Sequence, residues 1–161
     1  MNDSALLQLH KDVIRPEWID YNGHMNLAYY ILVFDYATDE LLNYIGLTEE
    51  FRSAHDASTF SAEIHVNYVR ELKAGDEVYT TTQLLGFDEK RFHYFHRMYH
   101  RDGWLAATNE LLSLYMDMGV RRVSAMPGEI LQRLGTLRQR HAHLPKPEQA
   151  GSVIGIGAKR R

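Results

Sequence analysis

The sequence predicts an α+β domain in which a curved antiparallel sheet wraps around one long central helix. Residues 27–45 place apolar side chains three or four positions apart, which is the helical period. Four segments between residues 58 and 118 have the composition of strands, and the short turns between them require neighbouring strands to be antiparallel. A single long helix must bury its apolar stripe, and this sheet is the surface available to cover it.

Local signals set the limits of the helices in the first half of the chain. Asn26 is expected to cap the long helix, and Gly46 is expected to end it. The preceding loop contains the Asn22-Gly23 turn signal. Two shorter elements are expected in this half: a strand near residues 9–16, and a helix from Thr48 through Ser53.

The second half of the chain is rich in strands. Its first strand, "STFSAEIHVNYV", alternates, so that Phe60 and Ile64 are expected on one face and Glu63 and His65 on the other. Pro127 is expected to open a last helix over about residues 128–140. The other strands are "VYTTTQLLGF", "RFHYFHRMYH" and "WLAATNELLSLYMDM", and "KAGDE", "DEK" and "RDG" are the turns. We expect one domain over residues 1–144 and an irregular tail over 145–161.

Composition narrows the class of protein. The chain has 161 residues, of which 45% are hydrophobic and 24% charged, as in an ordinary globular domain. A formal charge of -3 gives a nucleic-acid partner no global electrostatic support. The absence of cysteine excludes disulfides, thiolate zinc sites and a cysteine nucleophile. The N-terminus lacks the features of a secretory signal, and no apolar run approaches the roughly 18 residues of a membrane span. We therefore expect a cytoplasmic protein without membrane contact.

The loop "DYNGHMN", residues 20–26, concentrates polar and turn-forming residues immediately before the long helix. Asp20, its only carboxylate, fits an Asn-Gly turn as well as it fits catalysis. His24 fits a general base and a structural role equally. Asn26 fits an N-cap better than a reactant, although a cap would still order the N–H groups of the helix. Those unpaired N–H groups and the positive end of the helix dipole would suit a developing oxyanion.

The same loop, followed by "LAYY", resembles the D-x-x-G-H-x-N…Y signature of 4-hydroxybenzoyl-CoA-type hot-dog thioesterases. It also resembles the D-x-N-x-H-x-N-N-x-x-Y motif of acyl-carrier-protein thioesterases, with Leu27 in place of the second Asn. The segments "AEIHVNYVRELKAGDEV", "DGWLAATNELLSLYMD" and "RRVSAMP" follow in the order of that family, so the resemblance covers about residues 9–135. The stretches "LLGFDEKRFHYFHRMYH" and "WLAATNELL" are most similar to thioesterases of carnitine and betaine breakdown, including a domain fused to carnitine dehydrogenases.

The resemblance implies a hot-dog fold and an acyl-CoA thioesterase that acts as a homodimer or homotetramer. Coenzyme A would be part of the substrate, and no cofactor is expected. Asp20 would attack the thioester directly or act as a general base for water. The candidate catalytic residues are Asp20, His24 and Asn26, and the candidate substrate contacts are Gly23, Leu27, Tyr29, Glu63 and Trp18.

Two alternatives of different classes stay open. A hot-dog hydratase or dehydratase would have the pattern D-x-N-P-x-H, whereas here His24 comes four positions after Asp20 and no Pro intervenes. A non-catalytic acyl-binding module would keep the fold, and the intact Asp20, Gly23 and Asn26 argue against it.

Other candidate sites are weaker. On a strand, His93 faces away from His96 and His100, so no metal site is expected. Arg121, Arg122 and the basic residues of "GIGAKR" fit solvated charges or contacts to coenzyme A phosphates. Aromatic side chains fit either the core or the recognition of a quaternary ammonium group such as betainyl, with Glu63 or Glu110 as a nearby negative charge. These aromatic residues are Trp18, Tyr21, Tyr29, Tyr30, Tyr94, Tyr99, Trp104 and Tyr115.

Overall fold

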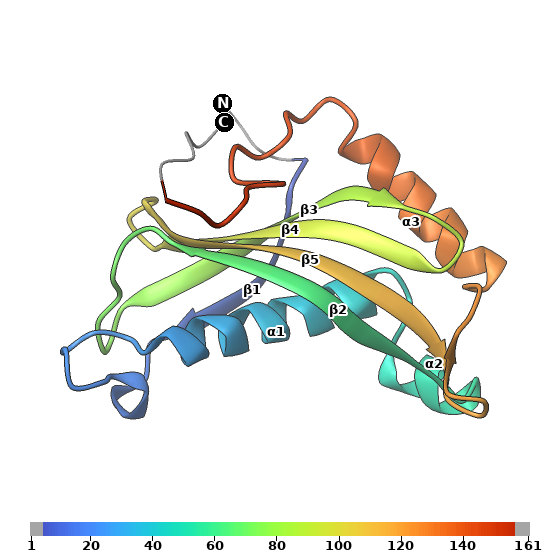
Figure 1. Cartoon of the computed structure of the whole chain (residues 1–161), viewed down its shortest axis with the longest axis horizontal. Helices are drawn as coiled ribbons and strands as arrows, with labels where there is room; N and C mark the ends of the chain where they lie inside the picture. The colour runs from blue at the N-terminus through green and yellow to red at the C-terminus, as the bar shows by residue number, and fades with distance from the viewer. Residues whose placement is uncertain (1–4, 157–161) are drawn as a thin grey trace.

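The computed structural model describes residues 5–156 and consists of one long helix, two shorter helices and a single sheet (Figure 1). The helices are α1 (Leu27–Tyr44), α2 (Glu49–Ala54) and α3 (Gly128–Arg140), with a 3-10 turn at Pro16–Trp18. The strands are β1 (Leu7–Val13), β2 (Ala57–Tyr68), β3 (Glu77–Phe87), β4 (Arg91–His100), β5 (Leu105–Asp117) and β6 (Arg122–Val123).

The sheet curves around α1, as the sequence predicts. Its order is β1-β3-β4-β5-β2, with β6 paired to β5, and every pairing is antiparallel. Helix α1 lies against the concave face, and α3 lies beside β3, where it also packs against the C-terminal end of α1 (Figure 1). The α+β class and the central helix are therefore confirmed.

Helix limits follow the capping signals. The Asn26 side chain accepts a hydrogen bond from the Ala28 N–H, and the Thr48 side chain accepts one from the Phe51 N–H. Gly46 follows α1 with a φ of +89°, a conformation that glycine adopts without strain. The first strand is Leu7–Val13 rather than 9–16, because Pro16 opens the 3-10 turn and the preceding Ile14 N–H bonds to Asp76 outside the β1–β3 ladder.

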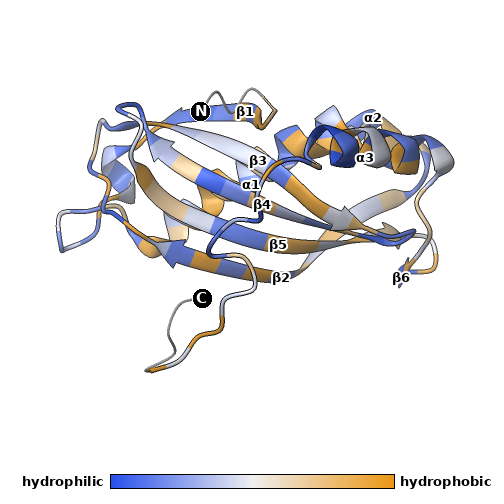
Figure 2. Cartoon of the chain, turned by 90° about the horizontal axis from the view of Figure 1, so that it is seen from above, coloured by the Kyte–Doolittle hydropathy of each residue, from blue (hydrophilic) through white to orange (hydrophobic). Residues whose placement is uncertain are grey.

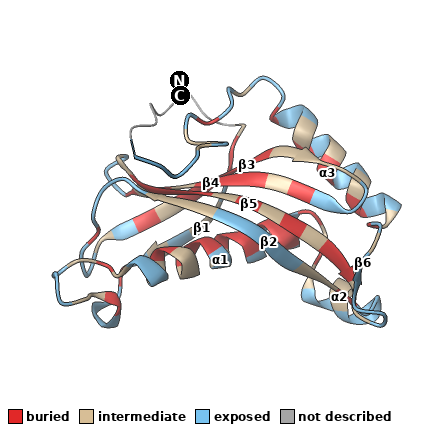
Figure 3. Ribbon diagram, in the orientation of Figure 1, coloured by how far each residue is buried: buried red, intermediate tan, exposed pale blue. Residues whose placement is uncertain are grey.

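Two buried clusters fill the space between α1 and the sheet. Figure 3 shows buried residues on α1 and on the strands above it, and Figure 2 shows hydrophobic and hydrophilic residues succeeding one another along the strands. One cluster joins the C-terminal half of α1 to α3 and includes Leu41, Tyr94 and Leu134. The other surrounds the N-terminal half of α1 and includes Trp18 and Phe34. This second cluster packs against the 20–26 loop.

Strand β2 forms an edge of the sheet and departs from simple alternation. A bulge lies between Ser61 and Glu63, so Phe60 pairs with Leu114 and Glu63 with Leu112. Because Leu112 and Leu114 are two positions apart on β5, Phe60 shares a face with Glu63. The prediction that Phe60 and Ile64 share a face is therefore wrong.

The chain after α3 crosses the outer face of the sheet without forming a helix or strand up to residue 156 (Figure 1). His141 Nδ1 accepts a hydrogen bond from the Leu84 N–H, and Gln83 Nε2 donates to the Pro145 carbonyl. Farther along, the Gly151 N–H donates to Glu110 Oε2 at 2.6 Å. Residues 157–161, including most of "GIGAKR", lie outside the described residues. No helix within residues 5–156 is both long enough and apolar enough to cross a membrane.

Candidate active site

The 20–26 loop is a compact turn closed by its own hydrogen bonds. The Asp20 N–H donates to the His24 carbonyl, and the Gly23 N–H donates to the Asp20 carbonyl, each at 3.0 Å. Asp20 Oδ1 also accepts from the Asn22 N–H at 2.8 Å, so the carboxylate is held in an Asx turn. Gly23 has a φ of +79°, which explains why glycine occupies this position. The carboxylate of the candidate catalytic residue Asp20 is thus itself part of the turn.

The loop delivers the chain to the N-terminus of α1 in a fixed position. The Met25 N–H donates to the Leu72 carbonyl at 2.8 Å, and the Asn26 N–H donates to the Trp18 carbonyl at 2.9 Å. Asn26 Oδ1 caps the helix by accepting from the Ala28 N–H at 3.0 Å. The Leu27 N–H at the first helical position has no acceptor within the helix. The positive end of the α1 dipole is therefore presented beside the Asp20 turn.

A cavity of about 740 Å³ joins this turn to the end of β2. The loop and α1 contribute one wall, and the chain that leaves β2 contributes the opposite wall. The lining residues are Asp20, Asn22, His24, Met25, Leu27 and Tyr30 on the first wall, and Tyr68, Val69, Arg70 and Glu71 on the second. The structure thus brings Asp20, His24 and Leu27 into one cavity.

Three side-chain contacts hold the two walls together. His24 Nε2 lies 3.0 Å from Glu71 Oε2, and the Tyr68 hydroxyl donates to the Leu27 carbonyl at 3.2 Å. The Tyr30 hydroxyl accepts from the Leu72 N–H at 3.1 Å. Burial raises the pKa of Tyr30 and of Tyr68, so both phenols stay neutral.

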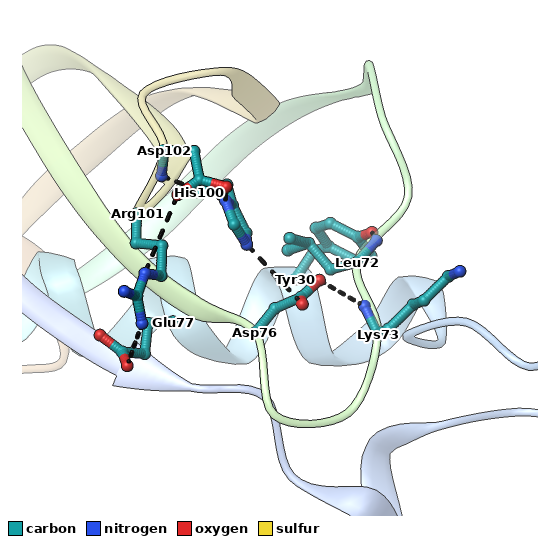
Figure 4. Close-up of polar contacts among 8 residues, drawn as sticks. All are labelled: Tyr30, Leu72, Lys73, Asp76, Glu77, His100, Arg101 and Asp102. Carbon is teal, nitrogen blue, oxygen red and sulfur yellow. Dashed lines mark hydrogen bonds and ion pairs between the residues drawn. The ribbon is translucent and has the colours of Figure 1, made fainter.

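The turn between β2 and β3, which carries Glu71, is also held in place by contacts outside the cavity (Figure 4). Beside the Tyr30–Leu72 contact, the Lys73 N–H donates to Asp76 Oδ2 at 2.8 Å, and His100 Nε2 lies 3.7 Å from Asp76 Oδ1. The β2–β3 turn therefore has contacts both to α1 and to the end of β4.

Tyr68, Arg70 and Glu71 were not predicted as site residues. All three lie at or just after the end of β2, more than 40 positions from Asp20 along the chain. The signal available in the sequence was that "YVRE" spans the end of the strand and lies within the segment that the family resemblance covers.

Of the five predicted substrate contacts only Leu27 lines this cavity, and the other four, Gly23, Trp18, Tyr29 and Glu63, lie outside its lining. Trp18 is only 3% exposed, stacks on Tyr29 at 5.5 Å between ring centroids, and lies under the Arg15 guanidinium at 4.7 Å. Glu63 lines a different cavity, of about 420 Å³, on the outer face of the sheet. Its neighbours there include His65, His93, Glu110 and Gly151.

The histidines of β4 are distributed as the strand alternation predicts. His93 Nε2 lies 2.7 Å from Glu110 Oε1 on the outer face. His96 is buried against α1, 3.1 Å from Thr38 Oγ1 and 2.8 Å from Thr82 Oγ1, and burial lowers the pKa of His96 to about 3. Among residues 5–156, no three His, Asp or Glu side chains form a group that could hold a metal ion.

Comparison with known proteins places this chain in a family. The model of the thioesterase-like superfamily matches residues 14–134. The betainyl-CoA thioesterase of Pseudomonas aeruginosa is 42% identical over 154 residues, which are 95% of this chain and 97% of that protein. The L-carnitine dehydrogenase/betainyl-CoA thioesterase of Agrobacterium fabrum is 38% identical over 92% of this chain, which spans 30% of that longer protein.

Solved structures agree with this assignment. A Staphylococcus aureus protein in complex with CoA is 29% identical, with a TM-score of 0.88 over 94% of this chain and 96% of that one. A Pseudomonas putida protein described as a candidate thioesterase is 32% identical, with a TM-score of 0.82 over 95% and 98% of the two chains. The resemblance inferred from the loop motif and the hot-dog fold are confirmed, and the chain belongs to the thioesterase-like superfamily.

Proposed function

We propose that this acyl-CoA thioesterase hydrolyses betainyl-CoA, with Asp20 as the catalytic carboxylate. The observation that carries the proposal is the placement of Asp20 and the start of α1 in one cavity. Membership of the thioesterase-like superfamily favours hydrolysis over the hydratase alternative. The betainyl group is suggested by the names of relatives that are 42% and 38% identical.

The chemistry follows from the two features that meet in the cavity. A thioester carbonyl oxygen directed at the first turn of α1 would accept from the Leu27 N–H, and the helix dipole would stabilise the oxyanion that develops there. Asp20 would remove a proton from the attacking water. The carbon–sulfur bond then breaks, the CoA thiolate takes up a proton, and the carboxylic acid is released.

A second route uses the same residues. Asp20 would attack the carbonyl itself and form an anhydride as the thiolate departs, and water would then hydrolyse the anhydride. In both routes Asn26 acts by fixing the first helical turn, and His24 by its contact with Glu71.

The assembly that fits this site is a homodimer. Strand β2 pairs only with β5 among the described strands, and exposed apolar side chains lie along it and directly after it. These are Phe60, Ile64, Tyr68 and Val69. Pairing of β2 with the same strand of a second copy would satisfy this edge and place the Asp20 cavity at the subunit boundary.

The test of the catalytic assignment is Asp20→Asn, assayed by thiol release from betainyl-CoA. The amide oxygen can still accept from the Asn22 N–H, so the turn is expected to persist, while turnover should fall by at least about two orders of magnitude. Binding of a non-hydrolysable betainyl-CoA thioether should be retained.

Asp88→Asn is the matched control. Asp88 Oδ1 likewise accepts from a turn N–H, that of Lys90, but in the β3–β4 hairpin far from the cavity lining. Its turnover should stay near that of the unmodified protein. Near-normal turnover of Asp20→Asn would refute the assignment.

A further inference from the structure

Two tyrosine rings line the Asp20 cavity and contact each other edge to face. The ring centroids of Tyr30 and Tyr68 are 5.2 Å apart at an interplanar angle of 84°. Tyr68 is 49% exposed, and its hydroxyl is bonded to the Leu27 carbonyl. Because the ring is held at both ends, by β2 and by α1, it is fixed beside the helix N-terminus.

The other aromatic residues considered for binding the ammonium group pack against other parts of the protein. Trp18 and Tyr29 stack on each other, and Tyr94 is fully buried. Trp104 stacks on His100 at 4.5 Å, and the Arg70 guanidinium lies 4.2 Å over the Trp104 ring. None of these rings lines the cavity that contains Asp20. Among the tyrosine and tryptophan residues described, only Tyr30 and Tyr68 line that cavity, and Tyr68 is the more exposed of the two.

The charge of the cavity lining favours a cation. Asp20 and Glu71 contribute two carboxylates, and Arg70 contributes one fixed positive charge. The Arg70 guanidinium is engaged with the Trp104 ring, and His24 is engaged with Glu71. Carboxylates and aromatic rings, both present in this lining, are the two kinds of group that bind quaternary ammonium ions.

We propose that Tyr68, supported by Tyr30 and with the Asp20 and Glu71 carboxylates in the same cavity, binds the quaternary ammonium group of the substrate; this inference depends on the proposed function. In a betainyl thioester a single methylene separates the nitrogen from the reacting carbonyl carbon. A cation so close to the carbonyl must lie beside the groups that process it. Tyr68 meets this requirement because its hydroxyl is bonded to Leu27, the first residue of the helix that faces the oxyanion.

The experiment compares kcat/KM for betainyl-CoA with that for 3,3-dimethylbutanoyl-CoA, in which carbon replaces the charged nitrogen. The preference for betainyl-CoA should exceed unity in the unmodified protein. Tyr68→Leu should reduce this preference by about 2- to 30-fold, the range of a cation–aromatic contact. Tyr68→Phe keeps the ring face and should keep most of the preference.

Tyr44→Leu is a matched control, since Tyr44 is 46% exposed and its hydroxyl is also hydrogen-bonded, as the acceptor from Arg140, at the other end of α1. It should leave the preference unchanged. The ratio of two substrates on one variant cancels losses from partial misfolding.

The outcomes separate the two proposals. Hydrolysis of neither thioester would overturn the proposed function. Equal hydrolysis of both by the unmodified protein would overturn the cation site and leave the thioesterase intact. A preference that survives in Tyr68→Leu, or that is lost equally in Tyr68→Phe, would overturn the assignment to the Tyr68 ring.

Discussion

His24 Nε2 lies 3.0 Å from Glu71 Oε2, and this contact joins the Asp20 loop to the β2–β3 turn across the Asp20 cavity. The two side chains are 31% and 70% exposed. Solvent-exposed pairs contribute little to stability, so the contact matters for the position of the loop rather than for the fold.

Glu71→Gln should therefore change the free energy of unfolding by no more than about 1 kcal/mol, as measured by denaturant titration. Turnover of the neutral 3,3-dimethylbutanoyl-CoA should fall, because the Asp20 loop loses one of the contacts that join the two walls of the cavity. The decrease should be smaller than in Asp20→Asn. Glu77→Gln removes a comparable exposed pair with Arg101, at 2.9 Å and outside the cavity, and should leave turnover unchanged. Equal turnover of the two variants would show that the His24–Glu71 contact has no catalytic effect.

Asn26→Ala should lower both stability and activity. The Ala28 N–H loses the Oδ1 acceptor, which costs about 1 kcal/mol for a typical N-cap, and the helix turn proposed to face the oxyanion is loosened. Chemical denaturation and thiol release measure the two effects. Asn26→Ser restores an acceptor and should recover most of both.

The α2 cap separates a general loss of stability from a local effect. Thr48→Ala removes the acceptor of the Phe51 N–H at a similar cost in stability, but Thr48 is distant from the cavity lining. The turnover of this variant should be nearly normal when it is measured at a temperature well below that of unfolding. If Thr48→Ala lowers turnover as much as Asn26→Ala, the effect at Asn26 is one of stability alone.

Local signals were sufficient to predict α1 and the long strands. Asn26 and Gly46 define the ends of the helix through a side-chain hydrogen bond and a positive φ, both of which act within a few residues. Likewise, the turns between β3, β4 and β5 contain residues that favour tight turns, so the antiparallel order follows. The clustering of Asp20, His24 and Leu27 was predicted because they belong to one loop and the helix after it.

Contacts between distant segments were not predictable in this way. Tyr68 and Glu71 reach the cavity because the register of β2 on β5 brings the end of β2 to the start of α1. The bulge beside Glu63 has no clear local signal, yet it reverses which face the preceding residues occupy. Trp18 is adjacent to the loop in sequence, but the packing of Tyr29 and Arg15 directs it into the core.

Stability should fall as the pH is lowered, through His96. Its pKa is about 3 in the fold, below the ordinary value of 6.5, because burial disfavours the charged imidazole. The unfolded chain therefore takes up the proton first, and the stability present above pH 6.5 is lost as the pH falls toward 3. Between neutral pH and pH 5 the loss is about 2 kcal/mol.

The pH dependence of the free energy of unfolding, measured by urea titration, checks this expectation. His141, whose pKa burial also lowers, adds to the slope in the same direction. His96→Gln keeps hydrogen-bonding groups near Thr38 and Thr82 and should flatten the curve. An equally steep curve for His96→Gln would assign the acid sensitivity to other groups.

The exposed edge of β2 leads to the last prediction, which concerns assembly. Among the described strands, β2 pairs only with β5, although it is 12 residues long and carries apolar side chains such as Ile64, which is 42% exposed. Such an edge invites pairing with another strand, and in a two-fold dimer Ile64 would lie close to the interface of the two copies.

Ile64→Lys should then convert a dimer into monomers at micromolar concentration in analytical ultracentrifugation, because like charges are brought together. Val120→Lys, at an exposed position in the turn after β5, should remain dimeric. Activity should fall with the loss of the dimer, since the Asp20 cavity opens beside the end of β2 and a second copy would complete its wall. A monomeric unmodified protein with full activity would contradict both the dimer and its role in the site.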